Sequence, residues 1–266
     1  MSGRTLPIAI VGAYVGLLLC SGCSEQPQAA RGPQTTQEAK KGKGITFPEV
    51  KSPDEKRVAQ KLRQVDGWYV VLDGKASPRY EDMGLDPPTF SPNSKRLAYV
   101  IRRSGKAAAV VDEVESQFYD EILSENVYIP PANGRPGYIG YRQMPPPTPG
   151  DNRGRLGLVF SPDSSRLAYF AWIDKNQLVF VEDDKRGPVV EGVGSFGILF
   201  SPDSKRIAYL GKREGKWHVV IDHKFSAGYT GIDSKLQFSP DWRTVKIKAQ
   251  VGEAWKSIEL DTAELK

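Results

Sequence analysis

A pattern of ten residues recurs along the chain and constrains its fold more than any other feature. It consists of phenylalanine, a Ser-Pro-Asp or Ser-Pro-Asn sequence, basic or small residues, and a short apolar run ending in tyrosine. Three copies begin at Phe90, Phe160 and Phe200, and a fourth from Phe238 keeps Phe-Ser-Pro-Asp but has no tyrosine. The last two spacings are 40 and 38 residues. That period is typical of a propeller blade of four strands. The sequence therefore predicts an all-β chain, a β-propeller of four-stranded blades.

The polar residues of the pattern predict a turn between the first and second strands of each blade. Proline presets φ at its turn position, and Asp or Asn hydrogen-bonds to nearby backbone. We assign these residues a structural role. They are Ser91, Pro92 and Asn93, then Ser161, Pro162 and Asp163, then Ser201, Pro202 and Asp203, and finally Ser239, Pro240 and Asp241.

An acidic residue follows each of the first three phenylalanines by 22 positions. These acids are Asp112, Glu182 and Asp222, and Asp73 closes an earlier strand-like run. A ring of carboxylates could hold a metal, but turn chemistry explains acids at the end of a strand, and we predict that role. The sequence predicts no metal, no cofactor and no catalytic residue. We also expect the aromatic residues at matching offsets to pack in the core, and these are Trp68, Tyr99, Tyr169, Tyr209, Trp217 and Trp255.

Basic residues follow the turn in each copy, as in Lys95-Arg96 and Lys205-Arg206, with Arg166 and Arg243 at related offsets. We interpret them as a solvated rim that keeps strand edges from pairing. The alternative is a docking ring for an acidic partner or an anionic glycan.

Two segments depart from the repeat. Residues 51–59 match the pattern without its phenylalanine, but Ser52 to Glu55 also fits a capping box before apolar residues at helical spacing. A diverged blade and a short helix both remain open. The spacing of 70 residues between Phe90 and Phe160 suggests a degenerate blade or an irregular insertion at about 126–155, in the connection between two blades. Six blades, one of them degenerate, are favoured, with five as the alternative.

The repeats resemble the WD40-like, or PD40, repeats of the TolB-type propeller family, with Ser-Pro-Asp as their identifying core. The resemblance covers about residues 51–261 and implies a propeller in an extracytoplasmic compartment. TolB itself carries an additional N-terminal α/β domain, which residues 24–44 could not form.

The N-terminus predicts export. Residues 1–22 combine a basic flank with an apolar run too short to span a bilayer, as a signal peptide does. The small residues before Cys23 resemble the lipobox of bacterial lipoproteins, although Cys20 stands where that motif usually has leucine. The resemblance implies lipidation of Cys23, and cleavage by an ordinary signal peptidase is the alternative.

Residues 23–44 are almost devoid of large apolar groups, so we predict a disordered tether before a propeller over 45–266. The formal net charge of +5 falls to about +2 without residues 1–44, which hold five basic and two acidic residues. A nucleic-acid partner is therefore not expected. The basic tether suits anionic lipid headgroups near a membrane anchor.

The segment 126–155 is the candidate surface for a partner, since aromatic residues and arginines are favoured at recognition sites. A decayed repeat without a role is the alternative. The candidate residues are Tyr128, Arg135, Tyr138, Tyr141 and Arg142.

Together these features predict a non-catalytic, lipid-anchored propeller that faces the periplasm or the cell surface. We expect it to be monomeric and to act as an interaction scaffold for an envelope protein. Binding of glycan or peptidoglycan, or hydrolysis by carboxylates, are the alternatives.

Overall fold

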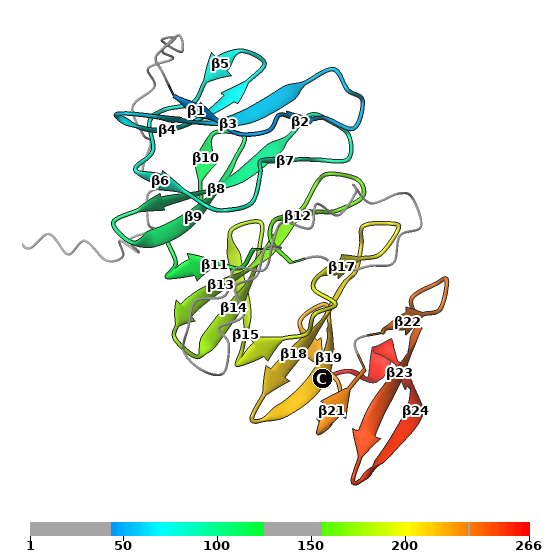
Figure 1. The fold of residues 1–266 in the computed structure, drawn as a ribbon. Helices are drawn as coiled ribbons and strands as arrows, with labels where there is room; N and C mark the ends of the chain where they lie inside the picture. Colours follow the sequence, from blue (N-terminus) through cyan, green and yellow to red (C-terminus); the bar gives the residue numbers. More distant parts are fainter. Residues whose placement is uncertain (1–43, 125–155, 234) are drawn as a thin grey trace, which may run out of the picture. The chain divides into compact units, whose positions relative to one another are not determined.

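The computed structural model describes residues 44–124, 156–233 and 235–266. These residues form five antiparallel sheets that follow one another in chain order, from blue to red in Figure 1. In the first sheet the strands are β1 (Ile45–Thr46), β2 (Val50–Lys51), β3 (Val58–Gln64), β4 (Gly67–Leu72) and β5 (Lys75–Ala76). In the second they are β6 (Asp82–Met83), β7 (Thr89–Phe90), β8 (Leu97–Arg103), β9 (Lys106–Val111) and β10 (Val114–Glu115).

The third, fourth and fifth sheets continue the series. The third contains β11 (Glu121–Ile122), β12 (Val159–Phe160), β13 (Leu167–Asp174), β14 (Gln177–Glu182) and β15 (Lys185–Val190). The fourth contains β16 (Gly192–Val193), β17 (Leu199–Phe200), β18 (Ile207–Arg213), β19 (Lys216–Ile221) and β20 (Lys224–Phe225). The fifth contains β21 (Gly231–Ile232), β22 (Gln237–Phe238), β23 (Thr244–Val251) and β24 (Ala254–Asp261), followed by a 3-10 turn, η1 (Thr262–Glu264).

One strand pattern is common to the sheets. An edge strand is split into two short pieces that pair with the same long strand, as β6 and β7 both pair with β8. We call the split strand a, and the strands after it b, c and d in chain order. Ser-Pro-Asp turns join a to b, and turns such as Asp73-Gly74 join c to d, as the sequence predicted.

Apolar side chains fill the space between each pair of consecutive sheets. Successive strand residues point to opposite faces, so Ala98 packs toward the third sheet while Tyr99 packs toward the first. Both residues are almost fully buried. Four such clusters join the first sheet to the second and so on through the fifth. Four-stranded sheets that pack face to face in series are the arrangement of propeller blades, and the all-β, propeller prediction is confirmed.

Residues 51–64 form strands, and the helical alternative for this segment is wrong. Ala59 and Lys61 are buried while their neighbours are less so, which is the period of two of a strand. The N–H of Arg57 donates to Ser52 Oγ at 3.0 Å, so Ser52 closes a turn between β2 and β3 instead of capping a helix.

The irregular segment is placed differently from the prediction. Residues 126–155 themselves lie outside the described residues, but β11 and β12 on either side both pair with β13. The segment therefore begins and ends within strand a of one sheet, and its predicted place in the connection between two sheets was wrong. Other sheets split strand a with short stretches, such as residues 84–88. The described residues thus form five sheets, and a sixth blade stays a prediction.

Candidate functional site

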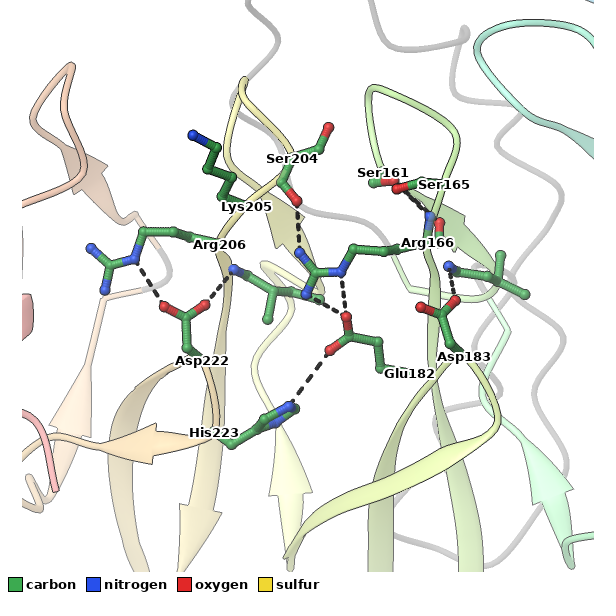
Figure 2. Close-up of polar contacts among 12 residues, drawn as sticks. Ser161, Ser165, Arg166, Glu182, Asp183, Ser204, Lys205, Arg206, Asp222 and His223 are labelled. Carbon is green, nitrogen blue, oxygen red and sulfur yellow. Dashed lines mark hydrogen bonds and ion pairs between the residues drawn. The ribbon is translucent and has the colours of Figure 1, made fainter.

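Each Ser-Pro-Asp turn is closed by the same hydrogen bonds, and Figure 2 shows one of them for the third sheet, from the N–H of Arg166 to Ser161 Oγ. Ser161 Oγ donates to Asp163 Oδ1 at 2.6 Å, and the N–H of Ser165 donates to the same oxygen at 3.0 Å. These bonds from Ser161 and then Ser165 lower the pKa of Asp163 to about 2. The N–H of Arg166 closes the turn by donating to Ser161 Oγ at 3.0 Å. In the other turns the serine hydroxyl likewise donates to the side-chain oxygen of the Asp or Asn two residues later. The pairs are Ser52 with Asp54, Ser91 with Asn93, Ser201 with Asp203 and Ser239 with Asp241.

An arginine after each of the first four turns joins its sheet to the next sheet. We call Arg57, Arg96, Arg166 and Arg206 the inter-sheet arginines. Arg96 Nε donates to Asp112 at 2.8 Å within the second sheet, while its NH1 donates to the carbonyl of Ser165 at 2.9 Å in the third. The guanidinium also lies over the ring of Phe160, 5.3 Å from its centroid. The phenylalanine of the motif is thus a contact for the arginine of the preceding sheet at three junctions, since the pairing recurs for Arg57 with Phe90 and for Arg166 with Phe200.

A buried serine completes the first three of these junctions. The N–H of Asp163 donates to Ser204 Oγ in the next sheet at 2.9 Å, and the N–H of Asn93 donates to Ser164 Oγ at 3.0 Å. Both serines have positive φ, 60° for Ser204 and 67° for Ser164, and this turn conformation directs their hydroxyls to the preceding sheet. The motif therefore links neighbouring sheets as well as shaping a turn.

These contacts correct the prediction for the basic residues. The arginines Arg96, Arg166 and Arg206 are engaged by neighbouring groups, so they form neither a free solvated rim nor a docking ring. Lys95 and Lys205 are exposed, as predicted. Arg243 occupies the place of Lys205 in its copy, and its side chain is 83% exposed.

The acids 22 residues after each phenylalanine are the partners of these arginines. Asp222 Oδ2 accepts from Arg206 Nε at 2.9 Å, and its Oδ1 accepts from the N–H of Ile207 at 2.9 Å. Asp222 lies at the turn after strand c with a φ of 49°. Its place in the turn agrees with the structural role that the sequence predicted. Among the described residues no group of acids, histidines and cysteines is arranged to hold a metal ion.

The third sheet modifies this arrangement. Glu182 stands where the other sheets have Asp, and Asp183 takes over the bond to the N–H of the first residue of strand b, Leu167, at 2.9 Å. This frees Glu182 to contact Arg166 and also His223 of the fourth sheet, whose Nε2 is 3.5 Å away (Figure 2). The hydrogen bond from His223, followed by those from Arg166, lowers the pKa of Glu182 although burial acts in the opposite direction.

A pocket of about 490 Å³ opens where the fourth and fifth sheets meet. Here Trp242 replaces the buried serine, and Arg206 donates instead to the Trp242 carbonyl and to Thr262 Oγ1 at 2.5 and 2.7 Å. Three cationic and two acidic side chains line the pocket, and both acids already accept hydrogen bonds from this chain. The lining residues are Arg206, Asp222, Lys224, Arg243, Asp261, Thr262 and Ala263.

A buried lysine that the sequence did not predict binds the stretch between the two pieces of strand a in the second sheet. Lys61 is only 6% exposed, and its Nζ donates to the carbonyls of Gly84 and Leu85 at 2.8 and 3.1 Å. Burial lowers its pKa. Asp86 of the same stretch accepts a hydrogen bond of 2.6 Å from Ser124, the last described residue before segment 125–155. The only sequence signal was a lysine at a position that is apolar in the next three copies.

The tyrosines of strand b are buried as predicted, but Trp255 is not in the core. Tyr99 and Tyr209 are at most 4% exposed, whereas Trp255 is 49% exposed. Trp217, at the same offset in the fourth sheet, packs in the cluster between the fourth and fifth sheets. Trp255 lies on the face of the fifth sheet that points away from the fourth, and the offset alone could not reveal that this face is exposed.

The predicted partner-binding and lipidation residues lie outside the described residues. They are Cys23, Tyr128, Arg135, Tyr138, Tyr141 and Arg142. The residues on either side of segment 126–155 are described. The N–H of Leu123 donates to the Phe170 carbonyl at 2.8 Å, and Leu123 and Leu156 both pack on the core between the third and fourth sheets. None of the described helices is long and apolar enough to cross a membrane.

No family model and no curated protein matches the chain. Solved structures that it resembles include TolB from Acinetobacter baumannii, at 13% identity and a TM-score of 0.33, over 84% of this chain and 51% of that one. The periplasmic gluconolactonase PpgL of Pseudomonas aeruginosa is 17% identical with a TM-score of 0.33, over 82% of this chain and 57% of that one. The Cps50 (Swd1) β-propeller domain of Myceliophteria thermophila is 13% identical with a TM-score of 0.33, over 78% and 62%. This chain thus spans less than two thirds of each of these three chains, and its fold assignment rests on its own five sheets.

Proposed function

We propose that the chain is a non-catalytic binding platform, an extracytoplasmic propeller that presents segment 126–155 to another envelope protein. The observation that carries the proposal is the position of β11 and β12, which are two pieces of one edge strand fixed on β13. Because both flanking strands still pair with β13, the segment interrupts strand a without disturbing the rest of the third sheet. Binding residues are often found on such connections, where a rigid scaffold positions them.

The contacts at the two ends support this role. Ile122 is 3% exposed in the core between the second and third sheets, and Phe160, in the second piece of strand a, is 8% exposed in the same core. The segment between them holds three tyrosines and four arginines within 126–155. Tyrosine and arginine are enriched among the residues that contribute most to protein interfaces.

An affinity capture from solubilised envelope tests the proposal. The tagged chain is compared with a variant that lacks 126–155 and with a Tyr138→Ala, Tyr141→Ala, Arg142→Ala variant, while Lys205→Ala, an exposed rim change, is the matched control. We expect a protein that binds wild type and the control but neither other variant. Recovery of no protein by wild type, together with binding to purified cell-wall glycan that the triple variant loses, would show a glycan-binding propeller instead. Turnover abolished by one carboxylate change would show a hydrolase.

Anchoring through Cys23 is a separate part of the proposal. Cys23→Ser should release the chain from the membrane fraction and abolish incorporation of labelled fatty acid. Membrane association that persists in this variant without fatty-acid label would contradict the lipid anchor.

A further inference from the structure

Strand d follows a second repeated pattern, Ser-x-x-Tyr, in the first, second and fourth sheets. In the fourth sheet Ser226 Oγ accepts from the N–H of Val219 at 3.0 Å, and the Ser226 N–H donates to the Val219 carbonyl at 2.9 Å. Three residues later, Tyr229 exchanges two backbone hydrogen bonds with Trp217, of 2.8 and 2.9 Å. Ser77 with Tyr80 and Ser116 with Tyr119 make the same bonds to strand c in their sheets.

The third sheet replaces the pattern but still covers strand c. Gly187 and Val190 stand in place of the serine and the tyrosine, and β15 pairs with β14 over most of its length. Strand c is therefore paired on both edges in the first four sheets.

The fifth sheet has no strand d among the described residues. After β24 the chain enters η1, Leu265 is buried in the core between the fourth and fifth sheets, and Lys266 exchanges backbone hydrogen bonds with Phe225 of β20. Within the part of the chain that the structure describes, β24 pairs with β23 alone. Its second edge is open over eight residues, Ala254–Asp261.

Backbone groups on this edge correspond to those that bind strand d elsewhere. Trp255 and Ser257 lie 38 residues after Trp217 and Val219, the two residues whose backbone groups hold strand d in the fourth sheet. Their register with strand b is the same, because Val219 lies opposite Leu210 and Ser257 lies opposite Lys248. The N–H and C=O of Trp255 and Ser257 therefore point to the open edge. Trp255 is 49% exposed, and its ring extends across β23 to Gly231 of β21, where a Cβ would be 3.1 Å from it.

The geometry points to a docking site for an extended segment of a partner protein, which adds to β24 as a fourth, antiparallel strand. Three of the four strands d of this molecule show the chemistry of the occupant: a small hydroxyl residue opposite Ser257 and an aromatic residue, three positions later, opposite Trp255. An extended segment can bind a sheet edge in this way through main-chain hydrogen bonds, with side chains providing specificity. This surface includes no residue of segment 126–155.

Beyond the three strands d already described, the Ser-x-x-Tyr pattern of the occupant is not found elsewhere in the chain. Residues 24–43 contain no aromatic residue. A second copy of the chain has the same three sequences engaged in its own sheets. The proposed occupant is a segment of a different protein.

A peptide that copies strand d of the fourth sheet, residues 222–230, is the probe. Added to the full chain, it should slow amide exchange at Trp255 and Ser257 at least tenfold, and its binding should weaken at least tenfold in Ser257→Pro. Proline removes an N–H on the open edge, where an edge strand tolerates it. Ser257→Ala keeps that N–H and is the matched control, and circular dichroism and thermal unfolding check that both variants fold.

A second arm changes only the peptide, so the test stands even if Ser257→Pro does not fold. A peptide with alanine at the positions of Ser226 and Tyr229 should bind at least tenfold more weakly than the parent peptide. The proposal is overturned if the peptide does not bind, if it protects amides elsewhere, or if both peptides bind alike. It is also overturned if the amides of Trp255 and Ser257 are protected in the free chain, because a segment of this chain would then cover the edge. None of these outcomes depends on segment 126–155, so they do not decide the proposed function.

Discussion

The junction between the third and fourth sheets and the outer side of the fifth sheet show how the same repeat can join neighbours or end a series. At the junction, Arg166 of one sheet contacts Phe200 of the next, and Ser204 accepts a bond from the preceding turn. In the fifth sheet Thr244 stands in place of the arginine. The last copy therefore lacks the group that would reach a following sheet.

The first copy lacks the complementary groups. Lys51 stands in place of the motif phenylalanine and Glu55 in place of the buried serine, the two residues that contact a preceding sheet. The outer face of the fifth sheet is also polar: exposed Lys246 and Lys248 occupy the positions of buried Ala208 and Leu210. Terminal repeats of stacked proteins often differ in this way, because a polar outer face is needed for solubility.

The largest effect should come from removing an inter-sheet arginine. Arg166→Ala leaves Glu182, whose side chain is 15% exposed, and the Ser204 carbonyl without a bond from this arginine. We expect the free energy of unfolding to fall by about 2 kcal/mol, the cost of leaving partly buried acceptors unsatisfied. Arg243→Ala, at an 83% exposed side chain of the fifth sheet, should change it by less than about 0.5 kcal/mol. Urea unfolding at pH 7 measures both, and equal losses would show that the arginines do not link the sheets.

A smaller loss of stability should distinguish Tyr99 from Tyr209, two buried tyrosines of strand b. Tyr99 shares a hydroxyl hydrogen bond of 3.0 Å with Tyr80 across the first junction, whereas the hydroxyl of Tyr209 has no partner among the described residues, because Val190 stands where Tyr80 stands. Tyr99→Phe should lower the free energy of unfolding by about 1 kcal/mol, and Tyr209→Phe should leave it unchanged or raise it. Thermal and urea unfolding of the two variants provide the measurement. A larger loss for Tyr209→Phe would mean that its hydroxyl is bonded, for example to a buried water.

Sequence reasoning could predict the blade but not the junction between blades. The period near 40 residues and the Ser-Pro-Asp turns act within one sheet, so they are visible as local pattern. Arg96 and Ser164 meet only after two sheets pack together, and nothing in the order of residues gave their partners. The split of strand a was missed for a similar reason, because β11 is two residues long and has no alternation to detect. Trp255 was misplaced since the exposure of its face depends on whether another sheet packs against the fifth.

The smallest effect concerns acid stability, and it compares the second turn with the third. Asp163 and Asn93 accept equivalent hydrogen bonds, but only Asp163 titrates, with a pKa lowered to about 2 by its bonds from Ser161 and Ser165. A folded-state pKa below the unfolded value of about 3.9 stabilises the fold above that value, and the contribution is lost as the pH falls through about 2. Asp163→Asn should therefore be less stable than wild type at pH 7, with a gap that narrows between about pH 4 and pH 2. Asn93→Asp, the matched reverse change, should acquire that acid dependence in its own turn. Thermal unfolding from pH 7 to pH 2 measures both variants. If the difference in stability between wild type and Asp163→Asn does not change with pH, the charge of the Asp163 carboxylate contributes nothing beyond the hydrogen bonds that an amide also accepts.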